Sequence, residues 1–318
     1  DWSSDVCSSD LSFTFVPGAW PLRMYCADRI TCRDIMKETP IVAGLISIIV
    51  TTFDRPDALD AVLRSLSRQN QREFEVLVAD DGSGPETTAL LERWRPRIGV
   101  ELIRVWHEHR GFRAAEIRNR AIRMSRGGYC IFLDGDCLVR PDFVSNHRKL
   151  AKPGWFVTGN RILLTQSLTD AVLHQQLAAE SWGIAQWIAR RCRGDINRLG
   201  PLLHVPLGPL RKLRSMKWQD ARSCNLAVWR TDLDRVDGFD ASFSGWGKED
   251  SDLLIRLLRS GVRRMDGHYA TGVLHLSHAP ADRSQLAGNE QRLAGVLDSQ
   301  RLRAVRGISS LDRDGSPA

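Results

Sequence analysis

A chain of 318 residues with 42% hydrophobic and 26% charged residues has the composition of an ordinary globular protein. This length suits one large α/β domain, or such a domain with an extension. The formal net charge of +7 favours phosphate-rich ligands or an anionic surface as partners. The basic runs come with no helix-turn-helix, zinc-finger or RNA-binding signature, so nucleic acid is not an expected partner.

The seven cysteines are odd in number, scattered, and never form a C-x-x-C pair. This usage favours reduced thiols in a cytoplasmic protein over a disulfide framework. No apolar run approaches the length that crosses a bilayer, and the segment 11–20 lacks the basic leader and cleavage site of a signal peptide. Residues 1–43 have no usable periodicity, and we expect them to be a disordered or non-native leader.

Strand-like and helix-like segments alternate from residue 45 onwards. We expect strands at 46–50, 75–79, 100–106 and 129–133, and helices at 56–69, 86–94 and 114–124. This alternation predicts an α/β fold with a doubly wound, mostly parallel sheet. Ligands bind such sheets at the carboxyl ends of the strands, and polar residues follow each of these strands.

The alternation loosens after residue 141. We expect a strand at 155–159, a long helix at 168–191, a loop or broken helix at 201–209, a strand at 225–229, a helix at 250–259 and a strand at 271–276. The sequence contains no internal repeat that would indicate a solenoid or a propeller.

Two aspartates, Asp134 and Asp136, follow the apolar strand 129–133 directly. On extended backbone, residues two apart face the same side, so these like charges repel each other. A hard divalent cation such as Mg²⁺ or Mn²⁺ relieves that repulsion and leaves open positions for substrate phosphates. The alternative is an Asp-Gly turn that merely ends the strand, but the position after a buried strand favours a cation site.

A second acidic turn, Asp80-Asp81-Gly82-Ser83, also follows a predicted strand. A carboxylate there can accept hydrogen bonds from a nucleobase or a ribose, as the acidic residue of dinucleotide-binding folds does. Ser83 and Glu86 have the spacing of a helix capping box, so the turn also has a structural interpretation. Both interpretations hold together if Asp81 binds the ligand and Ser83 caps the helix.

A third constellation begins at Gly245-Trp246-Gly247 and ends at the start of the helix 250–259. Helical spacing puts Glu249 and Asp250 on the inward face, whereas Asp252 is placed to form a surface pair with Arg256. An ionised carboxylate at a helix start suits a general base, although the helix dipole alone also accounts for an acid there.

Histidines follow two of the predicted strands. His275 and His278 stand at the end of the strand 271–276, where a neutral imidazole would complete a cation site. His107 and His109 also lie near a strand end, but the sequence places no comparable acidic residue beside them, and we assign them no role. A lone histidine is more often structural than a ligand.

Taken together, these segments resemble the family 2 glycosyltransferases, which have the nucleotide-diphosphosugar transferase (GT-A-like) fold. The likeness runs from residue 46 to 280. The matching segments, in the family's order, are the opening strand and loop 48–56, the acidic turn 80–83, the A-R-N helix 117–122, the D-x-D motif 134–136, and the segment 238–250, which is similar to galactosyltransferases and chondroitin-polymerase-type enzymes. Lys248 stands where glycine is common, Phe53 where tyrosine is common, and 168–217 has no counterpart.

The resemblance implies a role for each matching residue. The implied donor-binding residues are Thr51, Phe53, Arg55, Asp80, Asp81, Arg118, Asn119, Asp134 and Gly135. The implied metal ligands are Asp134, Asp136 and His275, with Mn²⁺ or Mg²⁺ as the cofactor. The implied catalytic base is Asp250, and the implied acceptor-binding residues are Trp246, Gly247 and Glu249.

The resemblance also divides the chain. After the leader come a nucleotide-sugar-binding half at 44–160, a helical basic insertion at 161–222, an acceptor and catalytic half at 223–282, and a C-terminal helix and tail at 283–318. The C-terminal parts form an acceptor-side extension of the fold.

The expected function is inverting, metal-dependent transfer of a sugar from a nucleotide-diphosphate sugar to a hydroxyl of a glycan or glycolipid, as in polysaccharide or lipopolysaccharide biosynthesis. Three alternatives remain: a nucleotidyltransferase that makes sugar nucleotides, a non-catalytic glycan-binding module, and a membrane-surface module. The basic, tryptophan-bearing stretch 168–217 would suit peripheral contact with the inner face of a membrane, although a helix packed on the sheet explains it as well.

Overall fold

The computed structural model describes residues 40–311, so the prediction of a leader at 1–43 falls almost wholly outside the described residues. Its central sheet has seven strands in the order β3-β2-β1-β4-β8-β6-β9. These are β1 (Val42–Thr52), β2 (Phe74–Asp80), β3 (Leu102–Trp106), β4 (Gly127–Asp134), β6 (Trp155–Thr158), β8 (Asn225–Trp229) and β9 (Arg263–Asp266). Only β8 runs antiparallel to its neighbours in this sheet, which confirms the mostly parallel α/β fold.

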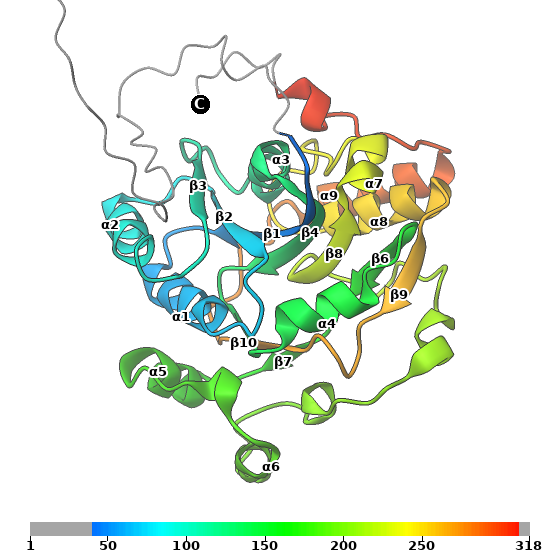
Figure 1. The fold of residues 1–318 in the computed structure, drawn as a ribbon. Coiled ribbons are helices and arrows are strands. Elements are labelled where there is room, and N and C mark those ends of the chain that lie inside the picture. The colour runs from blue at the N-terminus through cyan, green and yellow to red at the C-terminus, as the bar shows by residue number, and fades with distance from the viewer. Residues whose placement is uncertain (1–39, 312–318) are drawn as a thin grey trace, which may run out of the picture. The chain divides into compact units, whose positions relative to one another are not determined.

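Helices cover both faces of this sheet, as Figure 1 shows. One face carries α1 (Pro56–Ser67), α2 (Pro85–Trp94) and α4 (Phe143–Leu150), and the other carries α3 (Ala114–Met124), α7 (Arg230–Val236) and α8 (Glu249–Arg259). Alternating side chains of β1 serve the two cores, because Ile48 and Val50 pack on the first face and Ile49 on the second. Burial on both faces explains the nearly continuous apolar runs of the central strands.

A second, three-stranded sheet lies beside the first and has the order β5-β10-β7. Its strands are β5 (Cys137–Val139), β7 (Arg161–Leu163) and β10 (Val273–His275). The sequence pattern predicts only the last of these, because strands of three residues are too short to show periodicity. This small sheet brings the residues after Asp136 next to His275.

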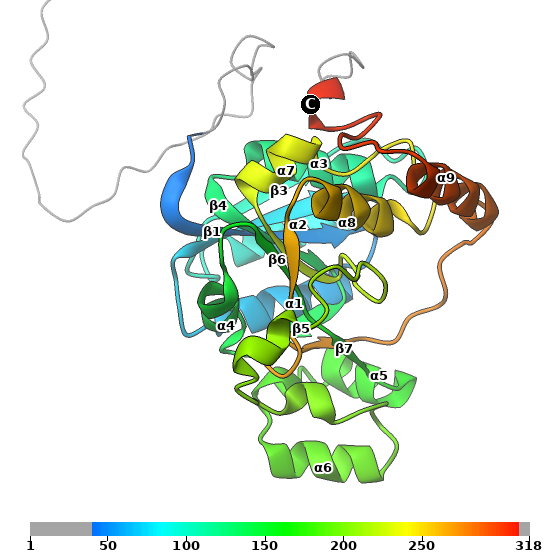
Figure 2. The ribbon, with the colours of Figure 1, turned by 90° about the vertical axis from the view of Figure 1, so that its right-hand side faces the viewer.

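The predicted long helix 168–191 is wrong. The chain forms α5 (Gln166–His174), a 3₁₀ turn η1 (Ala179–Ser181) and α6 (Ile184–Cys192) instead, which project below the sheet (Figure 2). Gln176 adopts a left-handed φ of 51°, which a helix interior does not allow, and Gly183 begins the next helix. Trp182 and Trp187 pack together at 5.1 Å across this break.

The remaining elements are two 3₁₀ turns before β8 and a helix and a 3₁₀ turn at the C-terminal end of the described residues. The proline-rich stretch forms two 3₁₀ turns, η2 (Gly200–Leu202) and η3 (Gly208–Lys212), as its composition predicts. The helix α9 (Leu286–Asp298) and the short turn η4 (Ile308–Ser310) close the described chain, and α9 packs against α8 through Leu293 and Ile255. Within 40–311, no helix combines the length and apolarity that a membrane span requires.

Candidate active site

The carboxyl ends of β1 and β4 meet closely at the edge of the sheet. The amide of Gly135 donates to the Thr51 carbonyl at 2.7 Å. A Cβ at Gly135 would come within 2.9 Å of that carbonyl oxygen, so glycine is required for the approach. The turn therefore presents Asp134 and Asp136 at the end of β1, as the parallel-sheet argument predicts.

Arg118 joins this edge to the start of α8. From α3, its guanidinium donates to Thr51 Oγ1 at 3.0 Å, to Glu249 Oε1 at 3.1 Å and to Asp134 Oδ1 at 3.3 Å. These partners come from β1, α8 and β4, which are far apart in the sequence. We call this set the Arg118 cluster. The structure thus brings four of the predicted site residues together.

Asp250 stands beside the Arg118 cluster in the first turn of α8. Its Oδ1 accepts a hydrogen bond from the Ser251 amide at 2.7 Å, which fixes the carboxylate at the helix start. Lys248, just before the helix, has a φ of +78° in the left-handed region, where glycine is favoured. Lys248 thus has a backbone conformation that glycine adopts more readily, at the position where the resemblance implies a glycine.

Asp136 faces two histidines. Its Oδ1 lies 3.6 Å from His275 Nε2 and its Oδ2 lies 3.4 Å from His278 Nε2. The pairing of β10 with β5 explains this, because the Leu276 amide donates to the Asp136 carbonyl at 2.9 Å. Both histidines therefore reach the same carboxylate, and the expected ligand His275 is the more buried of the two.

The charges at this edge favour a cation. Burial raises the pKa of Asp134 to about 6; Arg118 opposes the shift, and Asp136 and Asp250 add repulsion. Burial also lowers the pKa of His275, although Asp136 opposes this, so its imidazole is neutral and can act as a ligand. Carboxylate oxygens that repel one another, with a neutral imidazole beside them, fit a divalent cation.

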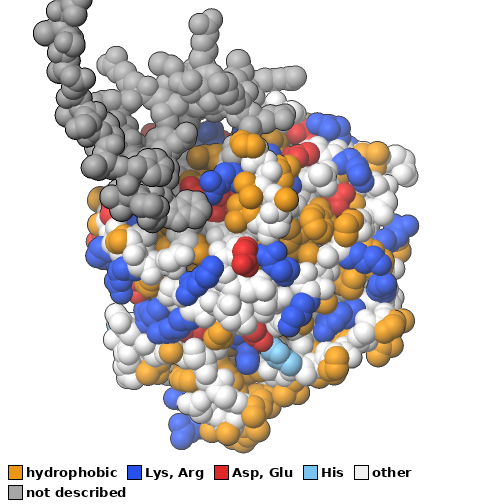
Figure 3. All heavy atoms as spheres, viewed as in Figure 1, with side chains coloured by type: hydrophobic (Ala, Val, Ile, Leu, Met, Phe, Trp, Pro, Cys, Tyr) orange, Lys and Arg blue, Asp and Glu red, His pale blue; other side chains and the backbone are white. Residues whose placement is uncertain are grey.

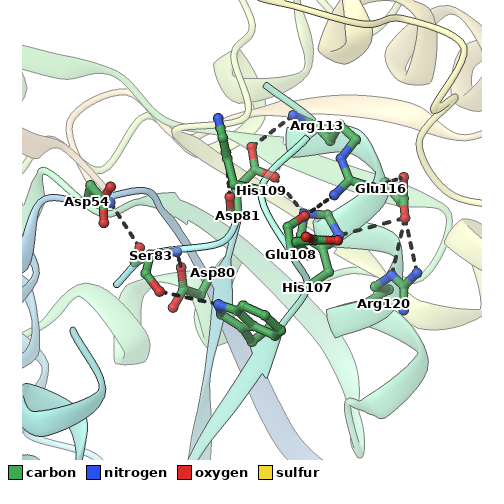
Figure 4. A network of polar contacts seen from close by, with 11 residues as sticks. Asp54, Asp80, Asp81, Ser83, His107, Glu108, His109, Arg113, Glu116 and Arg120 are labelled. Carbon is green, nitrogen blue, oxygen red and sulfur yellow. Dashed lines mark hydrogen bonds and ion pairs between the residues drawn. The ribbon is translucent and has the colours of Figure 1, made fainter. Parts of the chain in front are cut away.

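The acidic turn after β2 is tightly held (Figure 4). Asp80 is fully buried, accepts from the Ser83 amide at 2.8 Å, and accepts from Arg104 Nε at 2.8 Å. Asp81 accepts from the Arg113 amide at 2.8 Å and lies 2.6 Å from His107 Nε2. We therefore interpret Asp80 as the residue that fixes the turn, and Asp81 as the one that ties the turn to the loop 107–113.

The sequence-based view that His107 lacks an acidic neighbour is wrong. His107 lies between Asp81 and Glu116. The distance from His107 Nδ1 to Glu116 Oε1 is 3.7 Å. Burial alone would lower the pKa of His107, but the hydrogen bond with Asp81 and the nearby carboxylate of Glu116 raise it. The His107 contact, together with Arg113 and Arg120, in turn lowers the pKa of Glu116 to about 2.

The predicted residues Phe53 and Arg55 lie on the loop after β1. Phe53 stacks on His109 with the ring centroids 4.1 Å apart and the planes 13° from parallel. Gly82 allows the loop 107–113 to approach the acidic turn, since a Cβ there would meet the His109 backbone at 2.4 Å. Arg55 pairs with Asp57 at 3.1 Å at the start of α1.

Asn119 is fully buried and does not reach the polar edge directly. Its amide nitrogen donates to the Phe239 carbonyl at 2.8 Å, and its Oδ1 accepts from the Phe239 amide at 2.8 Å. Both atoms of the side-chain amide are thus occupied. The residue predicted to contact the donor therefore fastens α3 to the segment before α8.

The prediction of a surface pair for Asp252 is also wrong in its location. The pair with Arg256 forms, at 2.6 Å, but both side chains are completely buried. Arg301, from the C-terminal segment, adds a second partner at 2.9 Å and also contacts Asp240 at 3.0 Å. We call these residues the Asp252 network. Arg301 lies 45 residues beyond Arg256, so helical spacing could not indicate it.

Trp246 lines a cavity of about 590 Å³ between the loop 110–116 and the segment 281–285. The guanidinium of Arg283 lies over its ring at 5.1 Å. Gly247, between Trp246 and the helix start, has a φ of +106° that L side chains rarely adopt. Of the predicted acceptor-side residues, Trp246 therefore borders an open space, whereas Gly247 and Glu249 are outside its lining.

Sequence reasoning missed Arg161 and Arg104. Arg161, on β7, lies close enough to Asp134 and His275 to oppose the rise in the pKa of Asp134 and to add to the fall in the pKa of His275. Arg104, on β3, donates to Asp80 as described above. An arginine within a three-residue or edge strand carries no spacing signal, and only the pairing of the strands reveals its neighbours.

The fold and the acidic groups at this edge fit the GT-A class of glycosyltransferases. The chain belongs to glycosyl transferase family 2, because residues 47–214, more than half of its length, match that family. Residues 212–279 match the family described as the N-terminal domain of galactosyltransferase. Both matches confirm the resemblance drawn from the motifs, and they favour a glycosyltransferase over a nucleotidyltransferase or a binding module.

Curated relatives are similar over most of this chain. Validoxylamine A glucosyltransferase of Streptomyces hygroscopicus subsp. jinggangensis is 29% identical over 257 residues, which is 76% of this chain and 57% of that protein. Chondroitin synthase of Pasteurella multocida is 27% identical over 237 residues, 71% of this chain and 24% of that protein. The chain thus spans about half, or less, of the length of these relatives.

Solved structures share the fold. Staphylococcus aureus TarS residues 1–349 in complex with UDP has a TM-score of 0.51 at 15% identity, covering 80% of this chain and 65% of that one. The Pyrobaculum calidifontis mannosyltransferase PcManGT in complex with GDP-Man and Mn²⁺ has a TM-score of 0.50 at 18% identity, covering 90% and 70%. These likenesses confirm the GT-A architecture.

Proposed function

We propose that this chain catalyses inverting transfer of a sugar from a nucleotide-diphosphate sugar to a hydroxyl of a glycan or glycolipid. The observation that carries the proposal is the Arg118 cluster, which links the donor edge at Thr51 and Asp134 to the catalytic helix at Glu249. An inverting transfer needs a base on the side opposite the leaving diphosphate, within reach of both substrates.

Asp136, with Asp134 and His275, would hold a divalent cation, Mn²⁺ or Mg²⁺. When bound, such a cation neutralises charge that develops on the leaving diphosphate. The mutual repulsion of the carboxylates supports this assignment. Arg161, close to the same edge, supplies fixed positive charge there for the phosphates.

On the donor side, Phe53, Asp81 and Thr51 would hold the nucleoside, and the Arg118 cluster would keep Asp134 aligned. Phe53 offers an exposed ring for base stacking, since 41% of it is accessible. The nucleotide-sugar partner is supported by the UDP, UDP-GlcNAc and GDP-Man complexes of the structural relatives.

On the acceptor side, Asp250 would take the proton from the acceptor hydroxyl as its oxygen attacks the anomeric carbon. The donor carbon–oxygen bond breaks on the opposite face, and the diphosphate leaves. Glu249, beside Asp250, would orient the acceptor together with Trp246, which lines the cavity, and the adjacent Gly247. Relatives named as chondroitin and hyaluronan synthases support a polysaccharide or related glycan as the acceptor class.

The decisive test is Asp250→Asn. We expect sugar transfer to fall by at least about 10²–10⁴-fold, because general-base catalysis contributes that much. Binding of the donor nucleoside diphosphate, measured by calorimetry with Mn²⁺, should change less than about twofold, since Asp250 does not hold the donor. Near-normal transfer by the variant would remove Asp250 as the base. Screening nucleotide sugars for Mn²⁺-dependent hydrolysis identifies the donor to be used.

We also propose that α6 contacts an anionic membrane surface, which suits a lipid-linked acceptor. Trp187 and Trp182 pack inward, but Ile184 and Ile188 are 46% and 47% exposed, one turn apart. Exposed Arg191 continues this face of α6, and exposed Arg193 follows the helix. Hydrophobic and basic side chains lie side by side at this lower end of the molecule (Figure 3).

Sedimentation with vesicles tests this contact. Binding to phosphatidylserine vesicles, absent with phosphatidylcholine alone, should be lost when Ile184 and Ile188 are both changed to Ser. The matched control is Leu297→Ser, because Leu297 is equally exposed, at 47%, but lies on α9. Equal binding by all three proteins would contradict the contact.

A further inference from the structure

Asp136 borders two different sets of potential ligands. On one side stand Asp134 and the expected diphosphate, which offer only hard oxygen atoms. On the other side stands Cys137, next to His275, which is also the third ligand of the proposed Mn²⁺ site. The Cys137 Sγ lies 3.6 Å from Asp136 Oδ1, and His275 Nε2 lies 3.6 Å from the same oxygen. All three ligand atoms lie within 4.8 Å of one another.

The small sheet places the thiol there. Cys137 on β5 and His275 on β10 are directly opposite partners in the antiparallel register. Directly opposite residues put their side chains on the same face of a sheet. Cys137 is fully buried, and His275 is 8% exposed, so the thiol is covered and the imidazole borders the site. His278, 3.4 Å from Asp136 Oδ2, is a further nitrogen at the edge.

We propose that Asp136, Cys137 and His275 form a binding site for a thiophilic divalent cation such as Zn²⁺, which shares Asp136 and His275 with the Mn²⁺ site of the proposed function and uses Cys137 in place of Asp134. Zinc prefers four ligands in tetrahedral arrangement, drawn from thiolate, imidazole and carboxylate. This set supplies one of each, and His278 or water supplies the fourth. The inference rests on the proposed function in that both cations use Asp136 and His275.

Binding at this site replaces a proton on sulfur by the metal. The sulfur–hydrogen bond breaks, the proton goes to solvent, and the thiolate sulfur donates to the cation, with no change of oxidation state. Burial raises the pKa of the Cys137 thiol well above its ordinary value, and the adjacent Cys224 thiol adds to this. A hard cation such as Mg²⁺ gains nothing from sulfur and therefore leaves the proton in place.

The consequence is competition. A cation held by Cys137 and His275 draws Asp136 Oδ1 to that side, and the same oxygen cannot then coordinate a cation on the diphosphate. Zn²⁺ is therefore an inhibitor that Mn²⁺ displaces only at higher concentration. Cys137 and His275 set which divalent ions this enzyme tolerates.

Optical titration with Co²⁺ alone tests the site, because Co²⁺ mimics Zn²⁺ and gives a near-ultraviolet thiolate charge-transfer band. The full chain, freed of metal with a chelator and kept reduced, should develop this band with one equivalent. Cys137→Ser should abolish the band and weaken Zn²⁺ binding at least about 10-fold, which equals about 1.4 kcal/mol. Cys192→Ser, a change at an exposed cysteine on α6, should leave both the band and the Zn²⁺ affinity unchanged.

Two variants keep the result decisive. Cys224→Ser should retain the band, because Cys224 is outside the ligand set; loss of the band there with retention in Cys137→Ser overturns the assignment. Cys137→Ala replaces Cys137→Ser if the hydroxyl disturbs folding, as judged by thermal unfolding. Absence of the band in the unaltered chain, with Mn²⁺-dependent hydrolysis of a nucleotide sugar intact, overturns this inference alone. A thiolate band without any such hydrolysis overturns the proposed function and leaves the metal site standing.

Discussion

Two arginine–carboxylate clusters lie along the first turns of α8, and they differ in how completely their charges are paired. In the Asp252 network, both carboxylate oxygens of Asp252 accept from arginines, and Asp252 and Arg256 are fully buried. In the Arg118 cluster, one arginine serves two carboxylates and a hydroxyl at 3.0–3.3 Å. Glu249 Oε2 has no hydrogen-bond partner among residues 40–311.

The difference distinguishes a structural cluster from a functional one. A buried carboxylate that is fully paired gains nothing from a ligand, whereas an underpaired one is costly until a cation or a hydroxyl arrives. Burial and Asp250 accordingly raise the pKa of Glu249, with Arg118 opposing, and the pKa of Asp134 is raised as well. The underpaired carboxylates therefore destabilise the unliganded site, and binding of a cation or substrate hydroxyl would remove that cost.

The largest effect is expected at the underpaired edge. Asp136→Ala should reduce Mn²⁺-dependent turnover by about 10³-fold, because charge stabilisation by a bound cation is worth several kcal/mol. Hydrolysis of a nucleotide sugar over a range of Mn²⁺ concentrations measures it. Asp298→Ala, at the exposed end of α9, is the matched control. Unchanged Mn²⁺ dependence in Asp136→Ala would count against the cation site.

A substitution in the Asp252 network should lower the free energy of unfolding rather than the rate of sugar transfer. Asp252→Ala leaves the buried Arg256 without its carboxylate, and such losses cost about 3–5 kcal/mol of unfolding free energy. Urea unfolding measures this, and we expect the double variant Asp252→Leu, Arg256→Leu to lose less than Asp252→Ala. A loss below about 1 kcal/mol in Asp252→Ala would mean that the network is not holding α8 to the C-terminal segment.

Arg118→Lys tests whether the Arg118 cluster aligns Asp134, on the donor side, with Glu249 at the start of α8. A lysine keeps the charge but cannot reach three partners with fixed geometry, so alignment of Asp134 and Glu249 is lost. We expect kcat to fall roughly 10- to 100-fold, in keeping with about 1.5–3 kcal/mol for a charged hydrogen bond. The KM for the donor should change less, and Arg93→Lys, on the exposed side of α2, should change neither.

Much of the fold was predictable because long elements carry clear periodicity. The order of the elements from β1 to α3 and their buried faces follow the apolar spacing of the sequence, with Leu59 and Val62 in one core and Ile117 in the other. The strands that were missed, β5, β7 and β9, have three or four residues each, too few for a period to appear, and the missed helices α4 and α7 have only eight and seven residues. The break at 175–183 was missed because apolar residues, among them the buried Trp187, continue at helical spacing beyond it.

The site was predictable where a residue's role follows from its place after a strand, as for Asp134 and Asp136. It was not predictable where a role depends on pairing between distant segments. His107 gains Asp81 and Glu116 only when β2, β3 and α3 meet, and Asn119 finds Phe239 across 120 residues. Residue spacing contains no information on such contacts, because they are set by tertiary packing.

A third kind of buried polar group sharpens the comparison: His147 on α4 is fully buried and forms no ion pair among residues 40–311. Burial lowers its pKa to about 3, with Asn225 only partly opposing. Above its ordinary pKa of 6.5 the imidazole is neutral in both the folded and the unfolded state. As the pH falls below 6.5 only the unfolded chain takes up the proton, so stability is lost between pH 6.5 and about 3.

His147→Met should therefore flatten the pH dependence of stability without touching the paired or underpaired carboxylates. Between pH 7 and pH 5, the loss of unfolding free energy should be smaller in the variant by about 1–2 kcal/mol, from urea titrations at each pH. His174→Gln, an exposed histidine at the end of α5, should follow the unaltered chain. An equal loss in His147→Met would mean that this imidazole titrates in the folded state, and that a polar group buried without a charged partner is not the acid-sensitive element of the sheet.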